Sequence, residues 1–311
     1  MPDHDTETLD QDWSNYWQGR TAENAGSALV GIENHPDIHA FWEKNLSGIE
    51  RNITAIDLAC GAGTVANVMC ELGFVNVSGL DLSASAIDVL SKRLPDVKGY
   101  VAPADDTPFD DKEFDLIVSQ FGFEYGDFAT VIPEIARILK GGGHFFALSH
   151  HSGGGIHAEV SEQLDEVLKI KETGFLPAAR ELFETALAVN PEKTQAEVSA
   201  IFRPAQSQLL ELATTQKGLA EHIYVSTQRM FRQRKNYYPQ DIYEWFDGMS
   251  NEVNRFIGRM SSMKSAAIDE SKLKQMLDLF SKCGIEMEKP EPLIDQHNNA
   301  LGWMFKGQKQ I

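Results

Sequence analysis

Positive charge and long apolar runs are both scarce in this chain of 311 residues. Lys and Arg total 28 against 46 Asp and Glu, so the formal net charge is −18. Such a chain repels phosphate backbones and anionic lipid surfaces, and nucleic acid could bind it only through a local basic patch. No apolar run reaches the roughly 18–20 residues that a membrane-spanning helix needs.

Cysteine is equally rare, and Lys and Arg are absent from the first twelve positions, which carry five acidic residues. An acidic start is the opposite of the basic start of a signal peptide. The three cysteines, Cys60, Cys70 and Cys283, are odd in number and have neither metal-ligand nor redox spacing. We therefore expect a soluble, cytoplasmic protein without a metal site and without a membrane segment, in which residues 1–12 form a flexible acidic tail.

Short apolar runs alternate with amphipathic stretches in the first half of the chain. The amphipathic stretches at 64–72, 84–94 and 128–140 predict helices. The apolar runs predict strands, at 53–60, 75–82, 97–104, 114–121 and 144–149. Such alternation indicates right-handed crossovers and a parallel sheet that is covered on both faces.

Helical patterning without a convincing strand then fills residues 157–268. A helix near 273–284 and two extended stretches, 285–294 and 301–306, follow and predict an antiparallel pair that completes the sheet. The expected fold is α/β: a Rossmann-like, doubly wound, mostly parallel seven-stranded sheet with this antiparallel pair. We expect N-terminal helices over 13–50, a core of 51–156 with 269–311, and an inserted helical cap over 157–268.

The most specific local pattern is the glycine-rich turn Asp57-Leu-Ala-Cys-Gly-Ala-Gly-Thr64 between a predicted strand and a predicted helix. Gly61 and Gly63 let the backbone approach a ligand closely, and the helix N-terminus supplies unpaired N–H groups. Asp81 ends the next predicted strand, where a carboxylate can accept hydrogen bonds from both hydroxyls of a ribose.

The spacing Gly61-x-Gly63-x-x-Ala66 also matches the dinucleotide fingerprint, so a nicotinamide-dependent oxidoreductase is an alternative. Asp57 argues against it, because a carboxylate there repels a pyrophosphate and attracts an ammonium or sulfonium group. The antiparallel chain end also replaces a second parallel mononucleotide-binding half. A third hypothesis is a non-catalytic cofactor-binding protein whose helical block mediates interactions.

These residues resemble the class I S-adenosylmethionine-dependent methyltransferases. Asp57–Thr64 looks like their motif I, and Gly79–Ser83 looks like the acidic end of their second strand. Further segments that resemble theirs are 104–109, 114–118 and 135–143. The likeness covers roughly residues 50–150 and the tail from 269. It is strongest to methyltransferases of small molecules and ubiquinone-like metabolites, and it implies S-adenosyl-L-methionine as cofactor and methyl transfer to an O, S, N or C atom.

The resemblance also implies a role for each matching position. Asp57 would contact the methionine ammonium, directly or through water, and Ala59, Gly61 and Gly63 would form the turn beneath the methionine and ribose. Asp81 would hold the ribose hydroxyls, Leu82 would pack on adenine, and Ala104 would offer its N–H to the adenine ring. Pro103 stands where these families usually carry an acid, so Asp105 is the candidate replacement.

The loops after the fourth and fifth predicted strands are where open α/β sheets bind ligands. We expect Gln120 and Phe121 near the methyl group, and Tyr125 either binds substrate or is structural. His150 or His151 is the most economical proton acceptor, because imidazole titrates near neutrality. The alternative is that one histidine caps a turn and the other is solvated. Two adjacent histidines without further ligands make a poor metal site.

Two peripheral clusters complete the candidates. One cluster precedes the core and consists of Trp13, Tyr16, Trp17 and Arg20. These residues either form a lid over the cofactor, in which Arg20 pairs with the methionine carboxylate, or they simply pack against the core. The segment Arg229–Tyr238, the basic and aromatic island, is rich in basic and aromatic residues in an otherwise acidic chain. It is either a solvated helix face or a binding site for an anionic small-molecule acceptor. RNA is a less favoured ligand because of the overall negative charge. The helical block is a candidate substrate cap, homodimer interface, or both.

Overall fold

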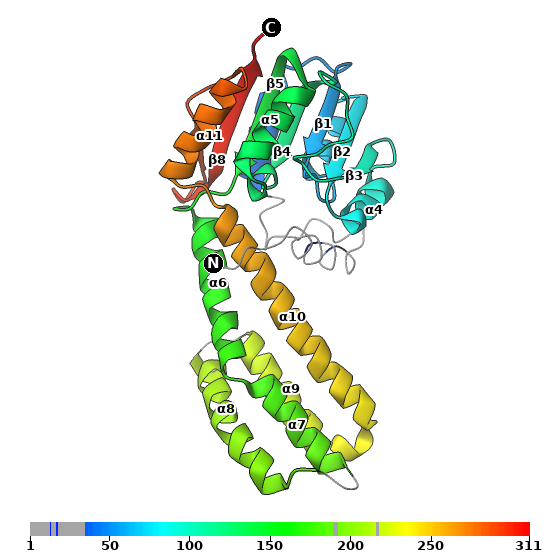
Figure 1. Cartoon of the computed structure of the whole chain (residues 1–311), viewed down its shortest axis with the longest axis vertical. Coiled ribbons are helices and arrows are strands. Elements are labelled where there is room, and N and C mark those ends of the chain that lie inside the picture. Colours follow the sequence, from blue (N-terminus) through cyan, green and yellow to red (C-terminus); the bar gives the residue numbers. More distant parts are fainter. Residues whose placement is uncertain (1–12, 14–16, 18–34, 189–191, 216–217) are drawn as a thin grey trace. The chain divides into compact units, whose positions relative to one another are not determined.

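The computed structural model describes residues 13, 17, 35–188, 192–215 and 218–311. The chain divides into two compact units (Figure 1). The α/β unit comprises the described residues up to Val160 together with Ser262–Ile311, and the helical unit is Ser161–Ser261. Within the described residues, no helix is both long enough and apolar enough to cross a membrane.

The sheet of the α/β unit has the order β3-β2-β1-β4-β5-β8-β6, and β7 also pairs with β8. The strands are β1 (Thr54–Leu58), β2 (Asn76–Asp81), β3 (Lys98–Val101), β4 (Phe114–Gln120), β5 (Leu139–Ser149), β6 (Ile285–Met287), β7 (Glu291–Ile294) and β8 (Ala300–Lys309). β1 to β5 are parallel, and β8 is antiparallel to its three neighbours. The predicted doubly wound, mostly parallel sheet with an antiparallel end is confirmed.

The antiparallel end differs from the expected pair in one respect. The stretch 285–294 is not one strand but two, β6 and β7, which pair with opposite ends of β8 and share the seventh position of the sheet. The break falls at Glu288–Pro290. Pro290 has no N–H group to donate to the ladder, which favours a break at this point, whereas Pro292 is tolerated within β7 because that strand lies at the edge of the sheet.

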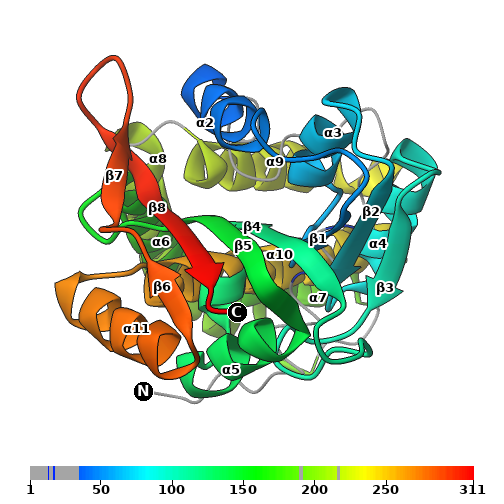
Figure 2. The ribbon, with the colours of Figure 1, turned by 90° about the horizontal axis from the view of Figure 1, so that it is seen from above.

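From residue 35 onward, the α-helices that belong wholly to this unit are α2 (Pro36–Leu46), α3 (Thr64–Glu71), α4 (Ala84–Arg93), α5 (Phe128–Ile138) and α11 (Glu270–Lys282). Figure 2 shows α2 and α3 on one side of the sheet and α5 and α11 on the other. Sequence chemistry sets their first turns: the Ser83 hydroxyl accepts from the N–H of Ala86 at the start of α4, and Asp127 caps α5. The two-sided cover confirms the predicted layers.

The boundary between α5 and β5 lies earlier than expected. The glycines 141–143 do not end a helix; they lie within β5, which begins at Leu139. Opposite them the register with β4 shifts: Phe114 pairs with Leu139, but Leu116 pairs with His144. β5 therefore carries extra residues in an irregular bulge, and glycine is well suited to such a position because it lacks a side chain.

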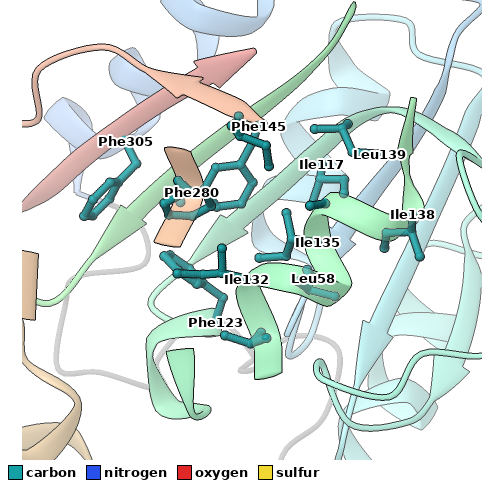
Figure 3. Packing of buried hydrophobic residues seen from close by; sticks show 14 of the residues in the cluster. Leu58, Ile117, Phe123, Ile132, Ile135, Ile138, Leu139, Phe145, Phe280 and Phe305 are labelled. Atoms are coloured by element: carbon teal, nitrogen blue, oxygen red, sulfur yellow. The ribbon is translucent and has the colours of Figure 1, made fainter. Parts of the chain in front are cut away.

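The main core lies between the sheet and the pair α5 and α11 (Figure 3). Phe123, Phe145, Phe280 and Phe305 are all completely buried there. Phe123 meets Phe145 edge to face, with 5.4 Å between ring centroids. Because Phe123 follows β4 by only three residues, this packing anchors the loop at the carboxyl end of β4.

The helical unit has a core of its own, which includes Phe175, Phe183, Ile223 and Phe246. Its helices are α7 (Phe175–Leu187), α8 (Gln195–Thr215) and α9 (Leu219–Arg232), with most of α6 (Gly155–Glu172) and α10 (Pro239–Ala266). The described residues between 161 and 261 contain no strand, as the helical patterning predicts.

Candidate functional site

The turn between β1 and α3 depends on left-handed backbone conformations. Ala59, Gly61 and Gly63 have φ values of 56°, 51° and 78°. A Cβ atom on Gly61 would lie 2.8 Å from the Trp17 ring, and one on Gly63 would collide with a methyl group of Leu90. Glycine is required at both positions, because any side chain would meet both steric contact and an unfavourable φ.

Asp57 lies on β1 directly before this turn and is buried. Its Oδ2 accepts a hydrogen bond of 3.0 Å from the N–H of Ala66 in the first turn of α3. Burial raises the pKa of the carboxyl from 3.8 to about 7; the Ala66 hydrogen bond opposes the rise, and the nearby charge of Asp81 adds to it. Near neutral pH, Asp57 is therefore poised between its acid and carboxylate forms.

Asp81, at the end of β2, connects that strand to the glycine turn. Its Oδ2 accepts from the N–H of Gly61 at 2.8 Å, and its Oδ1 accepts from the N–H of Ser83 at 2.9 Å. A carboxylate accepts hydrogen bonds through both oxygens, which is the chemistry that ribose hydroxyls need. The side chain is thus oriented by the fold and remains chemically suited to hydroxyl donors of a ligand.

A cavity of about 420 Å³ opens beside these two carboxylates, where β1, β2 and β4 end. It is within the usual size range of small-molecule sites. Its lining includes most of the predicted cofactor residues and one predicted catalytic residue, Tyr125. The cofactor residues are Trp17, Asp57, Ala59, Gly61, Asp81, Leu82, Ala104, Asp105, Gln120 and Phe121. Trp13, Pro103 and Asp127 are also part of the lining. Gly63 shapes the turn without lining the cavity, and Arg20 lies outside the described residues.

Gln120 and Phe121 form the wall at the end of β4. The Gln120 Oε1 accepts a hydrogen bond of 2.5 Å from the indole N–H of Trp42, a buried residue of α2. Phe121 has a φ of 51°, and its ring stacks on that of His150 with 4.6 Å between centroids. Trp42 was not among the predicted site residues, since nothing in the sequence links a helix at 36–46 to the end of β4.

Tyr125 joins this wall to His150. The Tyr125 hydroxyl lies 3.1 Å from the His150 Nε2, and the Trp13 ring meets the Tyr125 ring edge to face. Burial raises the pKa of Tyr125 well above 10. The phenol therefore stays protonated at neutral pH, so it reaches the cavity as a hydroxyl and not as a phenolate.

The structure separates the two histidines. His150 is buried behind Phe121 and Tyr125, outside the cavity lining. Its backbone N–H donates to Glu124 Oε1 at 2.9 Å. Burial lowers the pKa of its imidazole to about 3, so the ring is neutral. Burial also raises the pKa of Glu124 to about 7.

His151 also lies outside the lining. Its Nδ1 accepts from the N–H of Gly153 at 2.9 Å, and its ring stacks on Trp303. This geometry matches the first half of the alternative, in which one histidine caps a turn, but the other histidine, His150, is buried and not solvated. Among the residues that the structure describes, no group of three or more His, Cys, Asp or Glu side chains could hold a metal ion.

Comparisons with known proteins agree with this architecture. Residues 56–147 match the model of a methyltransferase domain. A demethylmenaquinone methyltransferase of Chlorobaculum tepidum is 32% identical over 117 residues, which are 37% of this chain and 48% of that protein. One of Thermotoga maritima is 36% identical over 95 residues, 30% of this chain and 42% of that protein. The chain thus spans about half the length of these curated relatives or slightly less.

Two solved structures show a more distant likeness. A geranyl diphosphate C-methyltransferase from Streptomyces coelicolor is 20% identical, with a TM-score of 0.37 over 45% of this chain and 64% of that chain. A SAM-dependent methyltransferase from Methanosarcina mazei is 15% identical, with a TM-score of 0.44 over 89% of this chain and 98% of that chain. Residues 56–147 thus match the methyltransferase domain family, and the strand order and the glycine turn agree with that match.

Proposed function

We propose that this protein transfers a methyl group from S-adenosyl-L-methionine to a small-molecule acceptor. The observation that carries the proposal is the 420 Å³ cavity with Asp57 and Asp81 at the ends of two adjacent parallel strands, beside the glycine turn. A carboxylate on β1 favours a cationic ligand over the pyrophosphate of a nicotinamide dinucleotide. The methyltransferase domain match over residues 56–147 supports the same choice.

The residues of the cavity fit the chemical groups of this donor. Asp57 in its carboxylate form would hold the methionine ammonium, and Asp81 would hold the ribose hydroxyls. Leu82, Ala104 and Asp105 line the region where we place the adenine. Trp13 and Trp17 also line the cavity, which supports the proposal that the N-terminal segment acts as a lid. S-adenosylmethionine supplies a methyl group already activated by its sulfonium, so the protein has mainly to position the acceptor and exclude water.

An acceptor that attacks through a hydroxyl, thiol or amine must also lose a proton. In this arrangement Tyr125, which stays a neutral phenol, meets and orients the acceptor while the acceptor's proton leaves to water; His150 acts through Tyr125, since the imidazole is behind the phenol and hydrogen-bonded to it. His150 is therefore a positioning residue that keeps the Tyr125 hydroxyl oriented. His151 could take a proton only through its Nε2, because its Nδ1 already accepts from the N–H of Gly153. Gln120 would orient the acceptor or the methionine end.

The class of the methyl acceptor is proposed from the relatives. Curated proteins that match this chain are named demethylmenaquinone methyltransferases, and a small molecule is consistent with the cavity volume. An anionic acceptor remains one candidate. We place the protein in the cytoplasm, in keeping with its acidic composition. The helical unit stays a candidate substrate cap and a candidate homodimer interface.

Calorimetric titration separates the leading function from the oxidoreductase alternative. We expect S-adenosylhomocysteine to bind and NADH not to bind; the reverse result would refute the proposal. Incubation with methyl-labelled S-adenosylmethionine and a metabolite extract then identifies the acceptor. Intact cofactor binding with no labelled product from any extract would instead favour the non-catalytic binding protein.

The positioning roles of Tyr125 and His150 have a separate test with Tyr125→Phe and His150→Asn. If His150 acts through Tyr125, both single variants and the double variant lose turnover to the same extent, because residues that act as a unit are not additive. Binding of S-adenosylhomocysteine should persist in all three. Unchanged turnover in the double variant would remove both residues from the proposed chemistry.

A further inference from the structure

A second cavity lies within the helical unit and plays no part in the methyltransferase proposal. It measures about 290 Å³, near the lower end of the range for small-ligand sites. Its lining comes from α7, α8, α9 and the short helical turn that follows α9: Leu182, Ala186, Gln195, Ser199, Phe202, Arg203, Gln206, Phe231 and Arg234. Arg234 belongs to the basic and aromatic island Arg229–Tyr238 that stands out in the sequence.

Two guanidinium groups, those of Arg203 and Arg234, line this cavity together. Among the described residues neither forms an ion pair, whereas Arg180 and Arg259 of the same unit each face a carboxylate. No acidic side chain belongs to the lining. Two like charges at one cavity repel each other, and an anion bound between them would relieve that repulsion.

The Arg234 side chain is already held in place. Its Nη1 donates to the carbonyl oxygen of Phe231 at 2.9 Å, and its guanidinium lies over the Phe231 ring, 4.6 Å from the centroid. A guanidinium has five N–H donors, so this single bond leaves donors for a ligand. Because the Arg234 side chain is already ordered, it loses less conformational entropy when an anion binds.

Part of the remaining wall is aromatic and packs against the core of the unit. Phe202 stacks obliquely against Phe175, and Phe231 meets Phe183 edge to face, with 5.5 Å and 5.4 Å between the respective ring centroids. Phe175 and Phe183 belong to the buried core of the unit. The aromatic wall is thus part of the folded core, and it offers a rigid surface to the apolar part of a ligand. Gln195, Ser199 and Gln206 add neutral hydrogen-bonding groups.

We propose that this cavity binds a small amphipathic anion, whose carboxylate, phosphate or sulfonate group contacts Arg203 and Arg234 and whose apolar part packs on Phe202 and Phe231. The volume favours a small molecule over a polymer. The inference is independent of the methyl-transfer proposal, because every lining residue belongs to the helical unit.

The test uses two fluorescent probes that differ in charge: 1-anilinonaphthalene-8-sulfonate, and N-phenyl-1-naphthylamine, which has no sulfonate. Both are titrated into the full chain with excess S-adenosylhomocysteine present to occupy the α/β cavity. The variant is the double substitution Arg203→Gln and Arg234→Gln. The matched control is Arg232→Gln, an exposed arginine of α9 outside the cavity lining.

We expect the double variant to bind the sulfonate probe at least about tenfold more weakly than the unsubstituted protein, as the loss of a charged hydrogen bond implies. Arg232→Gln should bind it as the unsubstituted protein does, and the uncharged probe should not distinguish the three proteins. Equal sulfonate affinity in the double variant, or no sulfonate binding by the unsubstituted protein, overturns the proposal. Circular dichroism checks the fold, and each single variant gives the same comparison if the double variant loses helical signal.

Discussion

Replacing Asp57 with Asn should stabilise the ligand-free protein at alkaline pH while weakening its binding of the cofactor. Asn is almost the same size and can still accept from the N–H of Ala66. It carries no charge, so it does not pay the desolvation cost that raises the pKa of Asp57 to about 7. The substitution therefore removes a buried carboxylate without leaving the Ala66 donor unpaired.

The size of the effect follows from proton linkage. A carboxyl whose folded-state pKa lies above its unfolded value of 3.8 binds more protons in the folded state. Its stabilising contribution is full below 3.8 and is lost as the pH rises through about 7. Between about pH 5.5 and about pH 8.5 the unsubstituted protein should lose about 2 kcal/mol from this group, since one pKa unit is worth about 1.4 kcal/mol.

Urea unfolding of the two proteins at those two pH values measures this contribution. His150 and Glu124 titrate in both proteins, so the difference between the two proteins isolates Asp57. Asp106→Asn, at an exposed position, controls for the change in net charge. A difference between Asp57→Asn and the unsubstituted protein that stays constant with pH, or that favours the unsubstituted protein at high pH, would refute the reasoning. Calorimetry should also show weaker binding of S-adenosylhomocysteine.

Three further predictions concern the same unit. Asp81→Ala should lower the affinity for S-adenosylhomocysteine by about 1–3 kcal/mol, measured by calorimetry, since the ribose hydroxyls would lose a charged hydrogen-bond partner. Equal affinity would exclude the ribose role, and Asp106→Ala is the control. Gly63→Ala should reduce the free energy of unfolding by about 1–3 kcal/mol, because φ is 78° and the new methyl group meets a packed side chain, whereas Gly48→Ala, where a Cβ would meet open space, should not. Phe280→Ala should cost about 3–5 kcal/mol in urea unfolding, since its ring is completely buried, and a loss below about 1 kcal/mol would contradict the core assignment.

The parts of the fold that were predictable from the sequence are those determined by local pattern. Alternating apolar runs and amphipathic stretches determine the parallel sheet, and the turn at 57–64 determines where its cavity lies. The boundary near Leu139 was not predictable, because glycines suit a helix end as well as a strand bulge, and only pairing with β4 decides between them. The division of 285–294 into β6 and β7 likewise depends on which part of β8 each piece meets.

In the site, the positions of the two carboxylates were predictable from local pattern, whereas contacts between distant residues were not. Asp57 and Asp81 stand at strand ends that sequence periodicity locates. The state of His150 is different, because its pKa depends on burial behind Phe121 and Tyr125, which are 29 and 25 positions away in the sequence. The contact between Trp42 and Gln120 spans 78 positions. Such contacts arise from tertiary packing, which a single sequence does not display.

The position of β8 has a consequence for how the chain reaches its folded state. Residues 300–309 are synthesised after every other described strand of the sheet, yet they lie between β5 and β6 in its interior. Until they arrive, the backbone of β5 presents an unpaired edge to other chains. The helical unit, which precedes β8 in the sequence and has its own core, can complete its folding during that interval. Crowded synthesis therefore exposes the nascent chain to edge-to-edge aggregation through β5, a hazard that ends when β8 inserts.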